Sequence, residues 1–284
     1  MRADMLPRSR SILALLAAVA LAAPPALPAR APAAGGTFDG PRWTPFAALP
    51  ATDREVERVA AQWSSLAGDV VRLSGAGATE AAVRSLSPGR RVVHLATHGF
   101  FVDPRCGHGA GGGRGIGGLA PAADSAAPPA RDAQAATDAD NPLRLSGLAL
   151  AGANRRSSAP EGADDGILTA EELAALDLAG VEWVVLSACD TGVGSLGAGE
   201  GVFGLRRALR IAGARTVVSS LWAVEDESAL RWMESLYRRR LRESQDAVAS
   251  VNGAMRDELS RRRAAGESTH PFYWAGFVAS ADWR

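Results

Sequence analysis

The sequence contains no lysine. All 31 of its basic residues are arginine, and 31 acidic residues balance them to a formal net charge of zero. The missing amine excludes a Walker A phosphate loop, a lysine Schiff base and a Ser–Lys hydrolase. A net charge of zero gives no general attraction to polyanions. Arginine runs at residues 238–240 and 261–263 are expected at exposed helix ends, and no aromatic residues interleave them, so nucleic acid is not expected as a partner.

Cysteine and histidine are also scarce, with two and four copies. Two cysteines, Cys106 and Cys189, cannot build a disulfide framework. A structural zinc would need several of the four histidines near a cysteine, and only Cys106 and His108 lie close in sequence, in a glycine-rich stretch that is interpreted as a loop. We therefore expect no metal and no cofactor.

The N-terminal residues 1–34 resemble a secretion signal. Arginines within the first ten residues precede an apolar run at residues 12–23, and the small residues 31–33 could form a cleavage site. The run is too short for a stable membrane span. If the signal is genuine, the protein is secreted or periplasmic. The alternative is a misplaced start codon, in which case the protein is cytoplasmic. Residues 35–50 are interpreted as a linker.

From residue 51 onward, helical and strand-like patterns alternate, which predicts an α/β fold with a mostly parallel sheet and helices on both faces. Thr52 and Glu55 have the spacing of a capping box at the first helix, and Thr169 and Glu172 repeat it. Residues 104–140 are rich in Gly, Ala and Pro and are interpreted as a disordered insertion. Strands are expected at 69–73, 91–97, 143–150, 181–187, 215–221 and 272–279, and helices at 52–66, 79–86, 169–178, 202–212, 227–241 and 245–262.

Two of the expected strands end in reactive side chains, His98 and Cys189. Reactive groups gather at the carboxyl ends of parallel strands. If the two strands are neighbours, about 4.8 Å apart, the imidazole can reach the thiol. A thiol nucleophile needs such a base to accept its proton and later to protonate the leaving amine. Each residue alone could be structural, because buried cysteine and satisfied loop histidine are common. Together they favour a catalytic dyad.

Residues around this pair suggest further roles. Gly99 lets its backbone N–H approach a substrate carbonyl, and with the N–H of Cys189 it could form an oxyanion hole. Asp190, Trp222 and Asp226 are candidates for a substrate pocket, in which the acidic groups would favour arginine at P1. Asp226 could instead cap the helix that starts near residue 227.

Several ordered stretches resemble the CHAT family of bacterial caspase-like proteins, relatives of caspases and separase. They are HLATHGFF at 94–101, LSACDTGVG at 186–194, the stretch at 199–226 and HPFYWAGFV at 270–278, with DGILTAEELAALDLAG before the cysteine strand. The resemblance implies a three-layer caspase-like domain over residues 51–284. It also implies that His98 and Cys189 hydrolyse peptide bonds of a protein or peptide substrate through a thioester acyl-enzyme.

The resemblance also predicts a further strand at the start of the domain, upstream of residue 51. In this sequence, the signal-like segment and the linker stand where that strand is expected. We therefore expect that strand to be absent, which would expose a sheet edge.

Two alternatives to a peptidase remain open. One is a catalytically degenerate caspase-like interaction module in a bacterial signalling or defence system, which the missing strand would favour. The other is a nucleotide-binding domain, because Gly192, Gly194 and Gly197 match a dinucleotide fingerprint. That match is incomplete, since no acidic residue ends the following strand to hold a ribose. Besides a protein or peptide substrate, an activating partner protein is a candidate partner.

Overall fold

The computed structural model describes residues 14–18, 45–66, 68–101, 143–144, 146–160, 163–188, 198–222 and 224–281. The expected insertion at 104–140 lies outside these residues. Six strands form the main sheet in the order β2-β1-β3-β6-β7-β8. All neighbours are parallel except β7 and β8, so the predicted α/β fold with a mostly parallel sheet is confirmed. The strands are β1 (Ala14–Ala18), β2 (Val70–Ser74), β3 (Val92–Phe101), β6 (Trp183–Ala188), β7 (Thr216–Ser220) and β8 (Phe277–Ala281).

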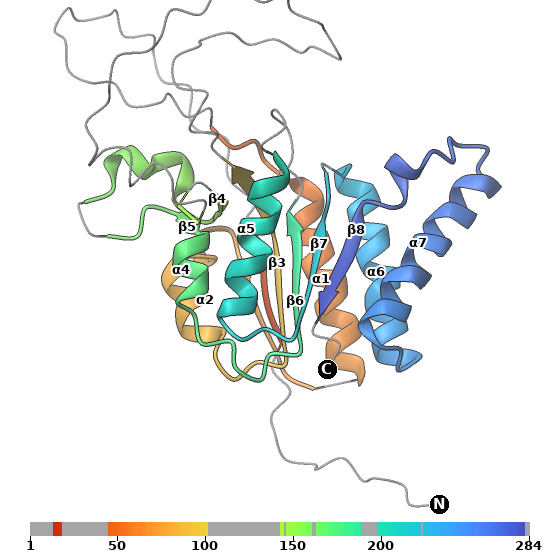
Figure 1. Ribbon diagram of the computed structural model, residues 1–284, viewed down its shortest axis with the longest axis horizontal. Helices are drawn as coiled ribbons and strands as arrows, with labels where there is room; N and C mark the ends of the chain where they lie inside the picture. The colour runs from red at the N-terminus through yellow and green to blue at the C-terminus, as the bar shows by residue number, and fades with distance from the viewer. Residues whose placement is uncertain are drawn as a thin grey trace, which may run out of the picture.

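Helices cover both faces of this sheet (Figure 1). Side chains alternate along β3, so Val93 and Leu95 pack into one hydrophobic cluster, whereas Val92 and Ala96 pack into the other. The first cluster lies against α2 (Glu80–Leu86), α4 (Ala170–Ala174) and α5 (Ala198–Ile211); the second lies against α1 (Pro50–Leu66), α6 (Asp226–Arg242) and α7 (Ala247–Ala264). The result is the three-layer arrangement expected from the sequence.

A short antiparallel extension is attached to the far end of β3. It consists of β4 (Ser146–Ala149), which pairs with β3, and β5 (Ile167–Thr169), which pairs with β4. The pairing brings His98 opposite Ala149 and Gly99 opposite Leu148. The strand that was expected to end at residue 97 therefore continues to Phe101, and β4 holds the backbone around His98.

The N-terminal apolar run contains a strand that the sequence analysis did not anticipate. Ala14–Ala18 forms β1, which pairs in parallel with β2 on one side and with β3 on the other. The expectation that the domain lacks a strand upstream of residue 51 is therefore wrong, because part of the signal-like segment occupies that place in the sheet. Apolar residues of this length fit a strand buried on both faces as well as a signal core.

The two sequence-predicted capping boxes have different outcomes. Thr169 and Glu172 form theirs in full: the threonine side chain accepts from the backbone N–H of Glu172, and the glutamate side chain accepts from the N–H of Thr169. Thr52 and Glu55 do not, because α1 already begins at Pro50 and Glu55 points into the core. Both pairs have the same spacing, but Glu55 binds His94 and Ser187 in the core instead of the start of its own helix.

The two arginine runs lie at the C-terminal ends of α6 and α7, as expected. Arg239 pairs with Asp257, and Arg261 pairs with Glu258. Arg262 is buried rather than exposed, and its Nε donates to the Ser268 carbonyl at 2.6 Å. Among the described helices, none is both long and apolar enough to cross a bilayer.

The position of β1 predicts the effect of removing residues 1–34. Loss of β1 would leave β2 without its ladder partner and would leave β3 unpaired on the side away from β6. We therefore expect the unfolding free energy to fall by more than about 5 kcal/mol, enough to abolish cooperative unfolding of an ordinary domain. Thermal unfolding followed by circular dichroism measures this effect. A chain starting at residue 11, which keeps β1, is the control and should match the full chain. Equal unfolding of the chain that starts at residue 35 would contradict the prediction.

Candidate active site

His98 lies near the carboxyl end of β3, where the main sheet meets β4, and only 8% of the residue is exposed. The neighbouring strand is β6, and the last pair of their parallel register joins Thr97 to Ala188. The sequence expectation that the histidine and cysteine strands are neighbours is therefore confirmed. Cys189, the predicted nucleophile, follows Ala188 directly and lies outside the described residues, as does Asp190.

The imidazole of His98 is oriented by a backbone group. Its Nε2 lies 2.7 Å from the carbonyl oxygen of Ala47. A carbonyl only accepts, so Nε2 donates, and in a neutral ring the lone pair is then on Nδ1. The ring of Phe46 lies beside the imidazole, with centroids 5.5 Å apart. A neutral histidine in this tautomer can accept a proton at Nδ1.

The segment that carries this carbonyl is held in place by Asn154, from the 3-10 helix Ala153–Ser158. The Asn154 side chain accepts from the N–H of Phe46 at 2.8 Å and donates to the carbonyl of the same residue at 3.0 Å. The oxygen and the nitrogen of the Asn154 side-chain amide therefore both bind the backbone of Phe46. Residues 45–49 were interpreted as part of a linker, and neither Ala47 nor Asn154 was predicted. An isolated phenylalanine in a proline-rich segment was the available signal.

The end of the cysteine strand is also held by side chains. Ser220, buried on β7, donates its hydroxyl to the carbonyl of Ala188 at 2.7 Å. One residue earlier, Ser187 donates to Glu55 Oε2 at 3.0 Å. The backbone that leads into Cys189 is therefore tied to β7 on one side and to α1 on the other.

Glu55 belongs to a buried polar cluster that joins α1 to β3, β6 and α6. Its Oε1 lies 2.8 Å from His94 Nε2, and His94 Nδ1 lies 3.0 Å from the Tyr237 hydroxyl. Burial, and then the charge of Glu55, raise the pKa of Tyr237 well above its usual range, so this hydroxyl remains protonated. The sequence analysis did not single out this cluster. Its signal is a glutamate within the apolar stripe of α1, one residue before Val56.

The remaining predicted site residues are placed as follows. Gly99 is a strand residue of β3 opposite Leu148. Trp222 follows the carboxyl end of β7 and stacks on Phe272, with ring centroids 5.9 Å apart. Asp226 is the first residue of α6, and its Oδ2 accepts from the N–H of Ala51 at 2.9 Å. The cap of α6 is Glu225, which accepts from the N–H of Ser228, and Asp226 instead satisfies the start of α1.

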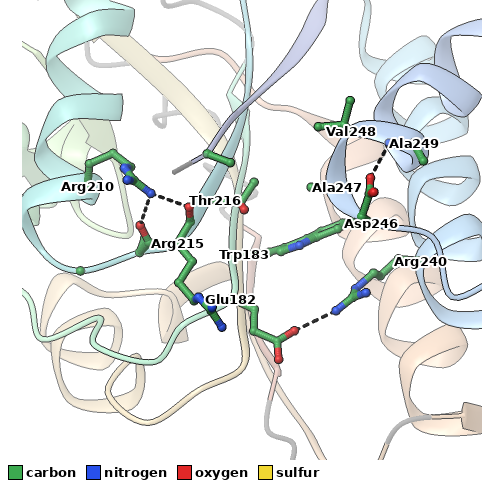
Figure 2. Close-up of a pocket in the computed structure, with 13 residues that line it drawn as sticks. Glu182, Trp183, Arg210, Arg215, Thr216, Arg240, Asp246, Ala247, Val248 and Ala249 are labelled. Atoms are coloured by element: carbon green, nitrogen blue, oxygen red, sulfur yellow. Dashed lines mark hydrogen bonds and ion pairs between the residues drawn. The ribbon is translucent and has the colours of Figure 1, made fainter. Parts of the chain in front are cut away.

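A cavity of about 1000 Å³ lies at the opposite edge of the sheet (Figure 2). Trp183 and Thr216, which line it, are the first residues of β6 and β7, whereas His98 lies near the carboxyl end of β3. One wall is closed by Arg240, which donates to Glu182 at 2.8 Å and lies over the Trp183 ring. Of the predicted site residues that the structure describes, none lines this cavity.

The mostly parallel sheet with helices on both faces is consistent with a three-layer caspase-like α/β fold. The family model of the CHAT domain matches residues 3–282, and the chain therefore belongs to the CHAT domain family, whose fold is related to that of caspase-like peptidases. Comparison with curated proteins gave no match. Among solved structures, the chain is similar to the crystal structure of a protein from Geobacter sulfurreducens, with 16% sequence identity, a TM-score of 0.42, and coverage of 87% of this chain and 89% of that chain.

The contacts of Asn154 predict that Asn154→Ala lowers the free energy of unfolding by about 1–2 kcal/mol, because the substitution leaves the amide and carbonyl of Phe46 without partners. Urea denaturation measures this loss. Arg155→Ala, at an exposed neighbour, is the control and should stay within about 0.5 kcal/mol of the wild type. An Asn154→Ala variant as stable as the control would contradict the role given to this side chain.

Proposed function

We propose that the protein is a cysteine endopeptidase in which His98 and Cys189 form the catalytic dyad. The observation that carries the proposal is the hydrogen bond from His98 Nε2 to the Ala47 carbonyl, because it leaves Nδ1 available as a base. The parallel pairing of β3 with β6 supports it, since the last described pair immediately precedes both residues. Family membership supports a peptidase-related fold.

In the proposed reaction, Nδ1 of His98 accepts the thiol proton of Cys189, and the thiolate attacks the scissile carbonyl. Backbone N–H groups of Gly99 and Cys189 would stabilise the oxyanion that develops. When the C–N bond breaks, His98 returns the proton to the leaving amine and a thioester remains. His98 then removes a proton from water, which attacks the thioester; the carboxylic acid product leaves and the thiol is restored. The Ala47 carbonyl would stabilise the imidazolium that forms in each half-reaction, because it accepts from Nε2 in both states.

The proposed substrate is a protein or peptide with arginine at P1. Asp190 and Asp226 supply the negative charge that such a residue requires. Asp226 accepts from Ala51 through one carboxylate oxygen, and the other oxygen is proposed to accept from the guanidinium group. The stacked pair of Trp222 and Phe272, of which Phe272 is 51% exposed, is proposed as an apolar wall of the same pocket.

The alternative function as a degenerate interaction module has lost the observation that favoured it. It relied on a missing strand and an exposed sheet edge, whereas β1 lies between β2 and β3 in the structure. An activating partner protein stays compatible with either function. The glycines of the nucleotide-binding alternative, Gly192, Gly194 and Gly197, lie outside the described residues.

For the cellular compartment we propose that the folded enzyme retains residues 1–34 and is cytoplasmic. A chain processed after Ala33 in export would lack β1, and the sheet would lose the strand that joins β2 to β3. The intact mass of the protein purified from its native cells tests this proposal. A mature form beginning near residue 34 would contradict it.

Covalent labelling with an arginine-based acyloxymethyl ketone tests the proposed activity. We expect a stoichiometric adduct on the wild type, none on Cys189→Ala, and a labelling rate at least ~10²-fold lower for His98→Ala, because the imidazole generates the thiolate. Intact-mass spectrometry measures the adduct. Cys106→Ala is the matched control, since it removes the other thiol and should label like the wild type.

A panel of probes with other P1 residues separates activity from specificity. Labelling by a probe with a non-basic P1, abolished by Cys189→Ala, would overturn the arginine preference and retain the peptidase. If folded wild-type protein reacts with no probe in the panel, the peptidase proposal is wrong and the interaction module is favoured.

A further inference from the structure

The buried carboxylate of Glu55, on α1, contacts both of the strands that carry the proposed dyad. Glu55 is 2% exposed, and within the described part of the chain no arginine pairs with it. Its two carboxylate oxygens instead accept from His94 at Oε1 and from Ser187 at Oε2. Since an isolated buried carboxylate is strongly unfavourable, both bonds are needed for the side chain to remain in this position.

The direction of each hydrogen bond follows from the chemistry of the groups. In a neutral His94 ring that donates to Glu55 through Nε2, Nδ1 accepts from the Tyr237 hydroxyl. The other ring nitrogen of His94 then donates to Glu55, which only accepts, and the hydroxyl of Ser187 donates to the second oxygen. Every group in the chain of bonds has a partner of the opposite kind. A fully satisfied network of this type fixes one arrangement of the elements that contribute to it.

These contacts lie shortly before the dyad positions along both strands. His94 precedes His98 by four residues, and Ser187 precedes Cys189 by two residues. The carboxylate of one helix residue therefore contacts both strands shortly before the reactive positions.

Helix α1 also connects Glu55 to the histidine by a second route. The Ala47 carbonyl that accepts from His98 lies three residues before Pro50, the first residue of α1. The start of α1 is fixed by Asp226, and its second turn is fixed by Glu55. A displacement of α1 toward or away from the sheet would therefore move the acceptor that orients the imidazole.

We propose that Glu55 is a positioning residue: by bonding to His94 on β3 and Ser187 on β6 at once, it holds α1 and the two strand ends in the alignment that the dyad requires. This inference rests on the proposed peptidase function for its kinetic consequence. Its structural consequence, the orientation of His98, is independent of activity. An apolar residue at position 55 could fill the space, but it could not fix the separation of α1 from each strand.

The decisive variants are Glu55→Met, which keeps the volume and loses the bonds, and Glu55→Gln, whose amide can accept from His94 and donate to Ser187. We expect Glu55→Met to lower the maximal rate of probe labelling by about 10–100-fold with little change in apparent probe affinity, because misplacement by about 1 Å has effects of this size. Glu55→Gln should restore the rate to within a few-fold of the wild type. Should Glu55→Met not fold, Ser187→Ala removes only the bond to β6 and is expected to lower the same rate.

Glu80 provides a matched control, since this carboxylate is also 2% exposed but lies on α2 across the sheet, where Oε1 accepts from the N–H of Gly166 at 2.7 Å. Glu80→Met should reduce stability while leaving the labelling rate unchanged. The proposal is overturned if folded Glu55→Met labels at the wild-type rate. It is equally overturned if the rate falls as far for Glu80→Met, since the loss would then follow stability alone.

A second readout separates this inference from the peptidase proposal. The ¹⁵N chemical shifts of the His98 ring report its tautomer without any substrate. We expect a single Nε2–H tautomer in the wild type, in Glu55→Gln and in Glu80→Met, and a tautomer mixture in Glu55→Met. If no probe labels the wild type, the peptidase proposal fails, and the ring shifts still decide the role of Glu55. Unchanged shifts in Glu55→Met would contradict that role.

Discussion

The parallel pairing of β3 with β6 is the constraint on which the rest of the structure depends. It aligns Ala96 with Ser187 and Thr97 with Ala188, so the chain leaves both strands at the same edge of the sheet. The other strands extend the sheet outward from this pair, with β1 and β2 on one side and β7 and β8 on the other. Both hydrophobic clusters contain residues of this central pair, so helix packing on each face reinforces the same alignment.

Backbone pairing alone does not orient side chains, and short polar contacts perform this task around His98. Asn154 fixes the peptide of Phe46, the Ala47 carbonyl accepts from the imidazole, and Ser220 holds the carbonyl of Ala188. Each contact joins residues far apart in sequence. The site is therefore assembled only when the sheet, the segment before α1 and the 3-10 helix that carries Asn154 are all in place.

The sequence predicted the sheet well because hydrophobic periodicity is a local property. The strands expected at 91–97 and 181–187 correspond to β3 and β6, although β3 continues to Phe101, and the capping box at Thr169 was placed correctly. The capping box at Thr52 was wrong, because Glu55 makes better use of its carboxylate with His94 and Ser187 than with its own helix start. That choice depends on tertiary neighbours, which spacing does not encode.

The N-terminal run shows a second limit of sequence reasoning. An apolar segment preceded by arginines satisfies the description of a secretion signal, and the same residues satisfy that of a strand buried on both faces. Composition does not distinguish the two, whereas pairing with β2 and β3 places residues 14–18 in the sheet. The Ala47 carbonyl was missed for a related reason, since a backbone acceptor leaves no signature in the identity of its residue.

The central claim is that His98 activates Cys189. The most direct test is the rate of iodoacetamide alkylation at each cysteine of the native protein between pH 5 and 9, measured by peptide mass spectrometry, with Cys106 as the internal reference thiol. The account predicts that Cys189 reacts much faster than Cys106 at about pH 6, well below the ordinary thiol pKa of about 8.5, and that His98→Gln removes this advantage. Parallel pH profiles for the two cysteines, unchanged by His98→Gln, would contradict it.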